Sequence, residues 1–395
     1  MPRLILFDGR HRDHLLPFTY LMPSAEIRVG GFSICEKWEA DLDIETRVLP
    51  VDYLKDKFAP EWENDNFVVE GNVIPGKDLI VALTSLKPNS ILLHKDIVVA
   101  GRLDADNMEK FARCEELNVN ESTYDGEVDF LSSRWHIFTK NGPEIEWDIK
   151  RLSPNAAGED FMSTNFVTLP EQIYIGKDVK CRNAFIDATN GPVYLGNKVK
   201  VEDGAMIKGP AYIGDHSTVK MGAKIYGPSS CGPWCKLGGE INNSVFHSYS
   251  NKAHEGFLGN SVIGQWCNIG ADTNNSNLKN NYEEVKVWDY TAESFSKTGL
   301  QFCGLFMGDH TKCGINTMFN TGTTIGVSSN IFGGGFPRTF IPSFSWGGAS
   351  GLKEFRLDKA TEAAERMMQR RSIDFTEADK KIFEHVFNIT QKFRS

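Results

Sequence analysis

A period of six residues runs through the middle of the chain and constrains its fold more than any other feature of the sequence. Eight successive sixth residues are apolar: Leu195, Val201, Ile207, Ile213, Val219, Ile225, Cys231 and Leu237. A second column, of small or apolar residues, stands two places before them: Val193, Val199, Ala205, Ala211, Ser217, Ala223, Ser229 and Cys235. An ordinary β-sandwich would instead alternate with a period of two. The two columns predict a solenoid of six-residue units, each a short strand and a tight turn, which bury one continuous core by stacking.

The same register begins at Ile175 and returns in pieces after Leu237. Its later members are Ile263, Ile269, Met307, Cys313, Phe319, Ile325 and Ile331. The small-residue column returns with the apolar one, which argues against coincidence. The gaps between the pieces predict loops that protrude from the coils.

The segments on either side of the solenoid have other patterns and divide the chain into four parts. Residues 1–150 predict a small α/β domain, with strands at 4–7, 67–69, 91–94 and 97–100 and a helix at 77–86. Residues 151–170 lose all periodicity and predict a linker into the β-helix domain, residues 171–350. Residues 351–395 predict a helical cap on the solenoid, in which Thr376 and Asp379 have the spacing of a capping box.

Composition excludes several classes of protein. The chain is 41% apolar and 24% charged, as in ordinary globular proteins, and no apolar run approaches the length of a membrane span. Its first residues do not resemble a signal peptide, so we expect a cytoplasmic protein with no membrane contact. The net charge of -9 argues against nucleic acid as a partner. The eight cysteines show no C-x-x-C pair, and we expect them to be reduced.

The amino-terminal segment resembles one family of enzymes. Arg12-Asp-His-Leu-Leu-Pro-Phe-Thr19, then Pro23 and Val29-Gly-Gly31, are similar to the start of sugar-1-phosphate nucleotidyltransferases, which have a glycine-rich loop with arginine, then L-x-P-L-T, P-K and V-G-G. The resemblance implies that Gly9 and Arg12 approach the nucleotide phosphates.

This resemblance is partial. Ser24 stands where a lysine should follow proline, and Glu70 is the nearest candidate for the carboxylate that holds Mg²⁺. Mg²⁺ is therefore expected only if this domain is active. Two interpretations stay open: an active uridylyltransferase, or a reduced domain that binds a ligand or only packs.

The solenoid carries a second resemblance, in the segment from Asn251 to Asn277. Its sequence, N-K-A-H-E-G-F-L-G and then I-G-Q-W-C-N-I-G-A, resembles the acetyltransferase core of the bifunctional N-acetylglucosamine-1-phosphate uridyltransferase and glucosamine-1-phosphate acetyltransferase family. The resemblance implies a left-handed parallel β-helix that uses acetyl-CoA to N-acetylate an amino sugar phosphate. It further implies a place in UDP-N-acetylglucosamine synthesis for the cell envelope, by a variant with a shortened first domain.

The resemblance also assigns roles to residues of this chain. His254 falls on the catalytic histidine. The residues expected to bind the sugar phosphate are Phe257, Asn268 and Lys252, and those expected along the acetyl-CoA groove are Ala271, Asn277, Asp309 and Val327. Phe257 replaces a tyrosine and Asp309 a serine. Because the acetyl-transfer site of the resembled enzymes lies between subunits, we expect a homotrimer.

The chemistry fits histidine, although other interpretations remain. An amine must lose a proton as it attacks a thioester, and the reference pKa of histidine, about 6.5, suits a base at neutral pH. A structural histidine is the plain alternative for His254. His216, His247 and His310 prompt a zinc hypothesis, because some trimeric β-helices that resemble carbonic anhydrases hold zinc with three histidines. His247 and His254 lack the close spacing of that family and no third ligand is evident, so no metal is expected. For the whole protein, the alternative is a non-enzymatic sugar-nucleotide-binding or scaffold protein with two decayed domains.

Overall fold

The computed structural model describes residues 2–394, and their contacts divide into two units. The first comprises residues up to 27 and 32–134, and the second comprises residues 28–31 and those from 135 onward. The predicted order of architectures is confirmed: an α/β domain, a left-handed parallel β-helix and a helical tail.

The first unit is built on a six-stranded sheet in the order β4-β1-β5-β8-β7-β9. Its strands are β1 (Arg3–Phe7), β4 (Thr46–Leu49), β5 (Asp65–Glu70), β7 (Ser90–His94), β8 (Ile97–Asp104) and β9 (Asn120–Thr123). Strands β4, β1 and β5 are parallel, β8 is antiparallel to both β5 and β7, and β9 is parallel to β7. The four strands predicted in this segment are confirmed as β1, β5, β7 and β8.

The helices of the first unit are α1 (Ile34–Leu42), α2 (Lys77–Thr84) and α3 (Ala105–Ala112), and its short strands are β3 (Phe32–Ser33), β6 (Val73–Ile74) and β10 (Asp129–Phe130). Helix α1 begins at a capping box, in which Ser33 and Glu36 bond each other's backbone N–H. Helix α2 is the predicted helix, ended two residues early.

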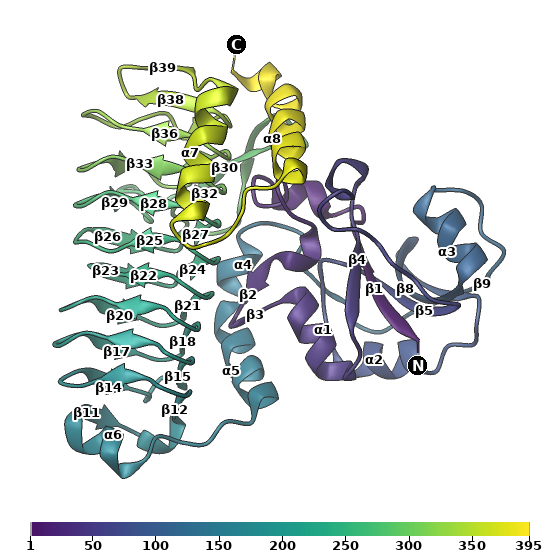
Figure 1. Ribbon diagram of the computed structural model, residues 1–395, viewed down its shortest axis with the longest axis horizontal. Helices are drawn as coiled ribbons and strands as arrows, with labels where there is room; N and C mark the ends of the chain where they lie inside the picture. Colours follow the sequence, from purple (N-terminus) through teal and green to yellow (C-terminus); the bar gives the residue numbers. More distant parts are fainter. Residues whose placement is uncertain (1, 395) are drawn as a thin grey trace. The chain divides into compact units, whose positions relative to one another are not determined.

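The β-helix of the second unit has three faces (Figure 1). The first face is β12 (Ile173–Ile175), β15 (Val193–Leu195), β18 (Ala211–Ile213), β21 (Ser229–Cys231), β24 (Val245–Phe246), β27 (Val262–Ile263), β32 (Phe306–Met307), β35 (Thr324–Ile325) and β37 (Phe340–Ile341). The second face is β13 (Lys180–Cys181), β16 (Lys200–Val201), β19 (Thr218–Val219), β22 (Lys236–Leu237), β25 (Asn251–Lys252), β28 (Asn268–Ile269), β33 (Lys312–Cys313), β36 (Asn330–Ile331), β38 (Ser345–Gly348) and β39 (Gly351–Glu354).

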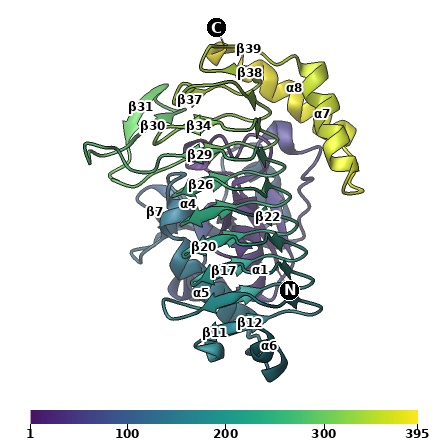
Figure 2. The same ribbon diagram turned by 90° about the vertical axis from the view of Figure 1, so that its left-hand side faces the viewer.

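The third face is β11 (Phe166–Thr168), β14 (Phe185–Asp187), β17 (Met206–Lys208), β20 (Lys224–Tyr226), β23 (Glu240–Asn242) and β26 (Phe257–Gly259), with β29 (Asn274–Asn275) and β34 (Met318–Phe319) as a separate pair. Figure 2 shows β17, β20, β26 and β29 stacked in this order. The predicted apolar column is the inward-pointing one: Ile213 of β18 pairs with Cys231 of β21 and both are fully buried. One core cluster follows the column from Ile173 to Ile341.

The corner between the first and second faces repeats one backbone conformation on every coil. Its residues have φ between 53° and 64°, although none is glycine: Asp178, Lys198, His216, Trp234, Tyr249, Trp266, His310, Ser328 and Phe344. Aromatic side chains among them stack, with ring centroids 4.2 Å apart for His216 and Trp234 and 4.1 Å for Tyr249 and Trp266. Stacking between coils offsets the cost of the left-handed conformation.

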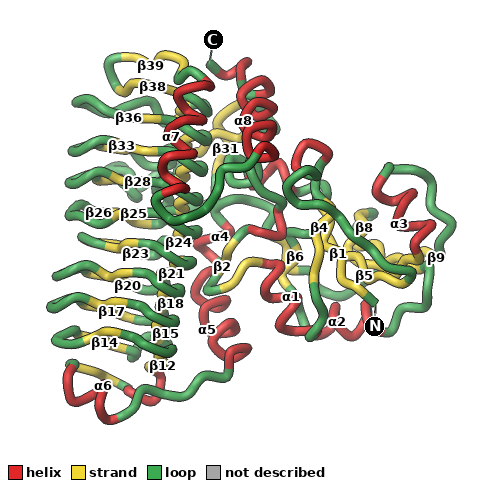
Figure 3. Tube along the Cα trace, in the orientation of Figure 1, coloured by secondary structure: helices red, strands yellow, loops and turns green. Residues whose placement is uncertain are grey.

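Helices of the second unit cover parts of the first and second faces: α4 (His136–Thr139), α5 (Asn141–Leu152), α7 (Leu357–Gln369) and α8 (Glu377–Ile389). Helix α6 (Glu159–Thr164) lies at the lower end of the coils in Figure 1, and its Phe161 joins their core. The remaining strands are β2 (Arg28–Val29), β30 (Lys286–Asp289) and β31 (Ser294–Lys297). Asn141 fixes α5 to the first face, because its Oδ1 accepts from Ser230 Oγ at 2.8 Å. Helices α7 and α8 lie side by side (Figure 3), and the capping box predicted at Thr376 and Asp379 is confirmed.

Candidate functional site

His254 lies in the turn that joins β25 to β26, at the corner between the second and third faces. In this turn the left-handed residue is Gly256 (φ 116°), four residues after the inward-pointing Lys252. On the next coil it is Asp272 (φ 59°), only three residues after Ile269. The turn at His254 therefore has one additional residue before its left-handed position, and the His254 side chain is exposed.

Glycine is required at position 256. A Cβ there would lie 2.2 Å from the carbonyl oxygen of Thr273 on the next coil, and φ is in the left-handed region. The stacked turns are tied together, because Asp272 N donates to Glu255 O at 2.9 Å. The neighbouring coil thus fixes the backbone that presents His254.

Lys252 lies inside the coil, at a position of the column that is otherwise apolar. It pairs in register with Leu237 and is 1% exposed. Its Nζ donates to His254 O at 2.8 Å and to Gly238 O at 3.1 Å, and burial lowers the pKa of Lys252 to about 8. Lys252 was expected to bind the sugar phosphate; in the folded chain its ammonium holds the His254 turn from within.

Phe257 and Asn277 come together on the third face. A Cβ on Gly259 would lie 2.6 Å from the ring of Phe257 and 2.7 Å from Asn277 Nδ2, so both side chains lie over this glycine. Asn277 Nδ2 donates to Asn260 Oδ1 at 2.8 Å, and Phe257 N donates to Asn274 Oδ1 at 2.7 Å. Asn274 and Asn277, in the amide-rich run 274–281, thus hold the strand that follows His254.

Asn268 and Ala271 lie on the coil that follows His254. Asn268 is exposed on the second face, in register between Asn251 and Lys312. Ala271 is partly buried in the turn that stacks on the His254 turn. His254, Phe257, Asn268 and Ala271 thus lie on two adjacent coils.

Asp309 and Val327 lie elsewhere, at the corner between the first and second faces. They are 3% and 0% exposed. Asp309 Oδ1 accepts from Gln265 N at 2.7 Å, as Asp215 accepts from Asn197 N at 2.8 Å on lower coils of the same corner. The Asp309 carboxylate thus bonds a turn of its own corner, and their expected place beside coenzyme A stays a prediction.

In the first unit, Gly9 and Arg12 follow β1. A Cβ at Gly9 would lie 2.4 Å from Glu70 Oε1, so glycine makes room for this carboxylate, which is 0% exposed and accepts from His11 N at 3.3 Å. Arg12 is 7% exposed: its Nε lies 3.3 Å from Asp8 Oδ2 and its Nη2 donates to Tyr53 Oη at 2.6 Å. The protein itself therefore neutralises the guanidinium expected to meet phosphate.

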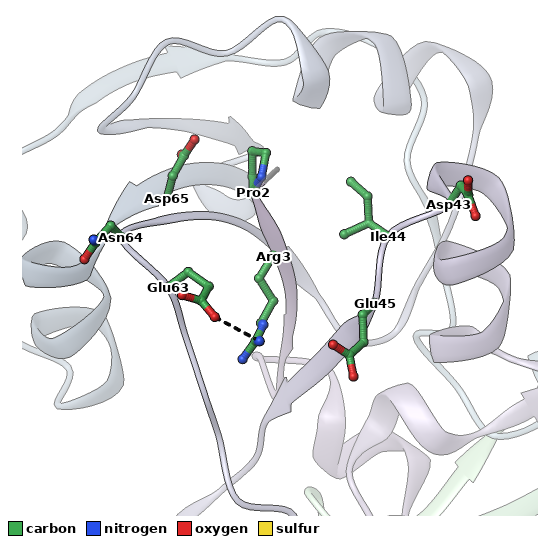
Figure 4. Close-up of a pocket in the computed structure, with 8 residues that line it drawn as sticks. All are labelled: Pro2, Arg3, Asp43, Ile44, Glu45, Glu63, Asn64 and Asp65. Atoms are coloured by element: carbon green, nitrogen blue, oxygen red, sulfur yellow. Dashed lines mark ion pairs between the residues drawn. The ribbon is translucent and has the colours of Figure 1, made fainter.

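A cavity of about 700 Å³ lies at the other end of β1 (Figure 4). It is lined by Pro2, Arg3, Asp43, Ile44, Glu45, Glu63, Asn64 and Asp65. Arg3 Nη2 pairs with Glu63 Oε1 at 2.9 Å. Carboxylates outnumber the cation, so this cavity does not suit a nucleotide phosphate.

Residues 2–394 contain neither a metal-binding cluster nor a membrane-spanning helix. No three His, Cys, Asp or Glu side chains among them lie close enough together to hold a metal ion. None of the helices in this part of the chain is long and apolar enough to cross a membrane.

Comparison with known proteins assigns the first part of the chain. A family model described as a sugar nucleotidyl transferase matches residues 4–156. This segment is a sugar nucleotidyltransferase-like domain. No curated protein matches the chain.

Solved structures resemble the chain only weakly. An LpxA UDP-N-acetylglucosamine acyltransferase from Bacteroides fragilis has 16% identity and a TM-score of 0.34, over 58% of this chain and 82% of that one. The polysialic acid-specific acetyltransferase NeuO has 15% identity and a TM-score of 0.28, over 53% and 98%. A point mutant of AntD, an N-acyltransferase from Bacillus cereus, has 12% identity and a TM-score of 0.25, over 55% and 99%. At these values, no conclusion about the activity of this chain follows from those proteins.

Gly256 is the site residue that the sequence analysis missed, whereas the amide-rich run that begins at Asn274 is visible in the sequence as a polar loop or a donor and acceptor surface. A signal for Gly256 was present, because Lys252 interrupts the apolar column two residues before His254. A polar residue in the inward column indicates that the adjacent turn needs hydrogen bonds from inside the coil.

Proposed function

We propose that the β-helix N-acetylates an amino sugar phosphate with acetyl-CoA as co-substrate, and that the chain is a variant of the bifunctional uridyltransferase and acetyltransferase family. The observation that carries this proposal is the His254 turn. Its backbone is held by Lys252 Nζ from within and by the next coil from above, while the imidazole is exposed. Such a turn presents a base in a fixed place.

In this proposal His254 acts as the general base. The sugar amine attacks the acetyl carbonyl, a C–N bond forms, and His254 accepts the proton that the nitrogen loses. When the C–S bond breaks, the thiolate of coenzyme A leaves and takes that proton. Backbone N–H groups of the adjacent turns stabilise the tetrahedral oxyanion.

The neighbours of His254 supply substrate contacts. The exposed Asn268 amide offers a donor and an acceptor to sugar hydroxyls, and the Phe257 ring offers an apolar wall. Ala271 leaves room beside the turn, and the Asn277 amide lies beside Phe257 over Gly259. Under this proposal the product feeds UDP-N-acetylglucosamine synthesis in the cytoplasm, for the cell envelope.

We further infer that the chain forms a homotrimer through its third face. One outward row at the lower end of this face is apolar and exposed, and its residues pair in register: Phe166 is 65%, Phe185 46% and Met206 47% exposed. The rings of Phe166 and Phe185 stack at 4.7 Å. A contiguous apolar stripe of this kind marks an interface, and a second copy presents a matching flat face.

The test is thiol release from acetyl-CoA with a panel of amino sugar phosphates, on the wild type and on His254→Ala. We expect the variant to lose roughly 100- to 10,000-fold in kcat, the usual contribution of a positioned base. Coenzyme A binding and thermal stability should change little, because His254 is exposed. Glu255→Ala, the exposed neighbour in the same turn, is the matched control. Equal turnover in wild type and His254→Ala would exclude His254 from the mechanism.

A further inference from the structure

A cavity of about 530 Å³ lies in the second unit between the outer surface of the second face and α7. It is lined by Lys312, Ser329, Asn330, Trp346, Glu354, Phe355, Arg356, Lys359, Glu362, Ala363 and Arg366. None of these residues belongs to the His254 turn. The volume is in the range of small-molecule sites.

Lys312 forms the floor of this cavity. It stands in one outward row with Asn330 and Trp346, which pair across β33, β36 and β38. Its Nζ donates to His310 O at 3.0 Å, and burial lowers the pKa of Lys312. An anion in the cavity would offset the lost solvation of this ammonium group.

Trp346 forms an aromatic wall. It is 40% exposed, and its ring is supported by Phe355 at 4.9 Å and Phe332 at 5.3 Å between centroids. A rigid indole with an open surface is a stacking platform for a planar ring.

Cations outnumber carboxylates around the cavity. Besides Lys312, these cations are Arg356, Lys359 and Arg366, against Glu354 and Glu362. Glu362 pairs with Lys359 at 3.0 Å and with Arg366, Arg356 pairs with Asp358 at 2.7 Å, and Glu354 pairs with Arg394 at 3.2 Å. These pairs occupy both carboxylates and the three exposed cations, whereas Lys312 makes no ion pair with a carboxylate among the described residues.

We propose that this cavity binds a nucleotide-type ligand, with a planar base stacked on Trp346 and a phosphate group at Lys312. The cavity, its aromatic wall and its excess of cations select this combination over a neutral sugar or a purely apolar molecule. Two sources share this chemistry: the adenosine-phosphate end of coenzyme A and a free uridine nucleotide. For coenzyme A the proposal rests on the proposed function, because Lys312 continues the row of Asn268; for a free uridine nucleotide it does not.

Calorimetric titration of the full chain with coenzyme A, adenosine 3′,5′-bisphosphate, UDP, adenosine and inorganic phosphate tests this site. We expect Lys312→Met to weaken nucleotide binding roughly 10- to 100-fold, since it removes a charged hydrogen-bond donor. Trp346→Leu should weaken binding by about 5- to 100-fold through lost stacking. Lys236→Met is the matched control, because Lys236 occupies the same outward register on β22, outside the cavity, and it should leave affinity within about 2-fold.

The ligands of this titration distinguish coenzyme A from a free uridine nucleotide as the occupant of the cavity. Binding of coenzyme A and the bisphosphate but not UDP assigns the acyl donor, and binding of UDP assigns a free nucleotide. Arg366→Ala, at an exposed side chain, replaces Lys312→Met if that variant unfolds early, and should weaken binding about 3- to 10-fold. His254→Ala should bind as the wild type does, so that loss of turnover and loss of this site stay separate. The proposal is overturned if the wild type binds none of the nucleotides, or if Lys236→Met and Lys312→Met weaken binding equally.

Discussion

At the level of single residues, polar side chains in the inward column shape the His254 turn and the coil after it. Lys252 donates to the backbone of two turns, and Asn275, 4% exposed, accepts from Gly259 N at 2.9 Å and donates to Gly259 O at 3.1 Å. Buried polar groups are tolerated when their hydrogen bonds are satisfied. Lys252 and Asn275 thus replace apolar core contacts with hydrogen bonds that fix the backbone on either side of Phe257.

The buried charge of Lys252 should make stability depend on pH. Its folded pKa of about 8 lies below the ordinary value of 10.5, so between these pH values the unfolded chain binds more protons and stability rises with pH. The free energy of unfolding of the wild type minus that of Lys252→Met should rise by on the order of 1 kcal/mol over about one pH unit above the folded pKa. Urea unfolding at both ends of that interval measures it.

The control for this experiment is Lys236→Met, which removes an exposed lysine from the neighbouring strand. The difference in the free energy of unfolding between the wild type and Lys236→Met should stay constant over the same pH range. Lys252→Met should also lower kcat while coenzyme A binding persists, because the His254 turn loses its inner hydrogen bonds. A flat difference for Lys252→Met would mean that burial does not shift the titration of Lys252.

At the level of helices and strands, the stacked aromatic residues at the corner between the first and second faces explain where the helical tail packs. The stacked row of corner residues ends at His310 and Phe344, and α8 supplies Phe383 at 5.2 Å from His310 and Phe387 at 5.2 Å from Phe344. Arg371 extends the cover, with its guanidinium 5.3 Å from the Trp234 ring. The helical tail thus covers the row of aromatic rings that stack at this corner from coil to coil.

The apolar stripe on the third face gives a prediction about assembly. Phe185→Glu should dissociate the proposed trimer, because each interface would bury a carboxylate without a partner. Light scattering at micromolar concentration should give three chain masses for the wild type and about one for the variant. Lys180→Glu, a charge change at an exposed residue on the second face of the same coil, should leave the assembly intact. A monomeric wild type would exclude the trimer.

For the molecule as a whole, the two units are expected to differ in activity. Arg12 is neutralised by Asp8 and donates a hydrogen bond to Tyr53, and Ser24, 1% exposed, donates to Asp8 at 2.8 Å in place of the expected lysine. Loss of one such electrostatic group costs on the order of 100-fold in rate. Pyrophosphate release from UTP and N-acetylglucosamine-1-phosphate should therefore be at least about 100-fold slower than in dedicated enzymes. Turnover on the order of 10 per second, typical of enzymes generally, would contradict this.

The repeat architecture could be predicted from residue spacing, because each coil imposes the same local demand. An apolar residue must point inward at every sixth position, and Ile213 and Cys231 do so in register. The cap of the last helix is equally local, since Thr376 and Asp379 bond each other's backbone within one turn. Both features were predicted from spacing alone and are confirmed.

The contacts between coils, in contrast, could be found only in the folded chain. Met307 pairs with Ile263 although a long insertion separates the two residues in the sequence, and no spacing rule predicts that pairing. The hydrogen bonds of Lys252 and Asp309 could not be predicted for the same reason: each residue was expected to face a ligand, and each bonds the backbone of another turn. Arg12 likewise meets Tyr53 only after β1 and the loop that follows β4 come together. Hydrogen bonds between segments distant in sequence depend on stacking and packing, which a residue pattern does not encode.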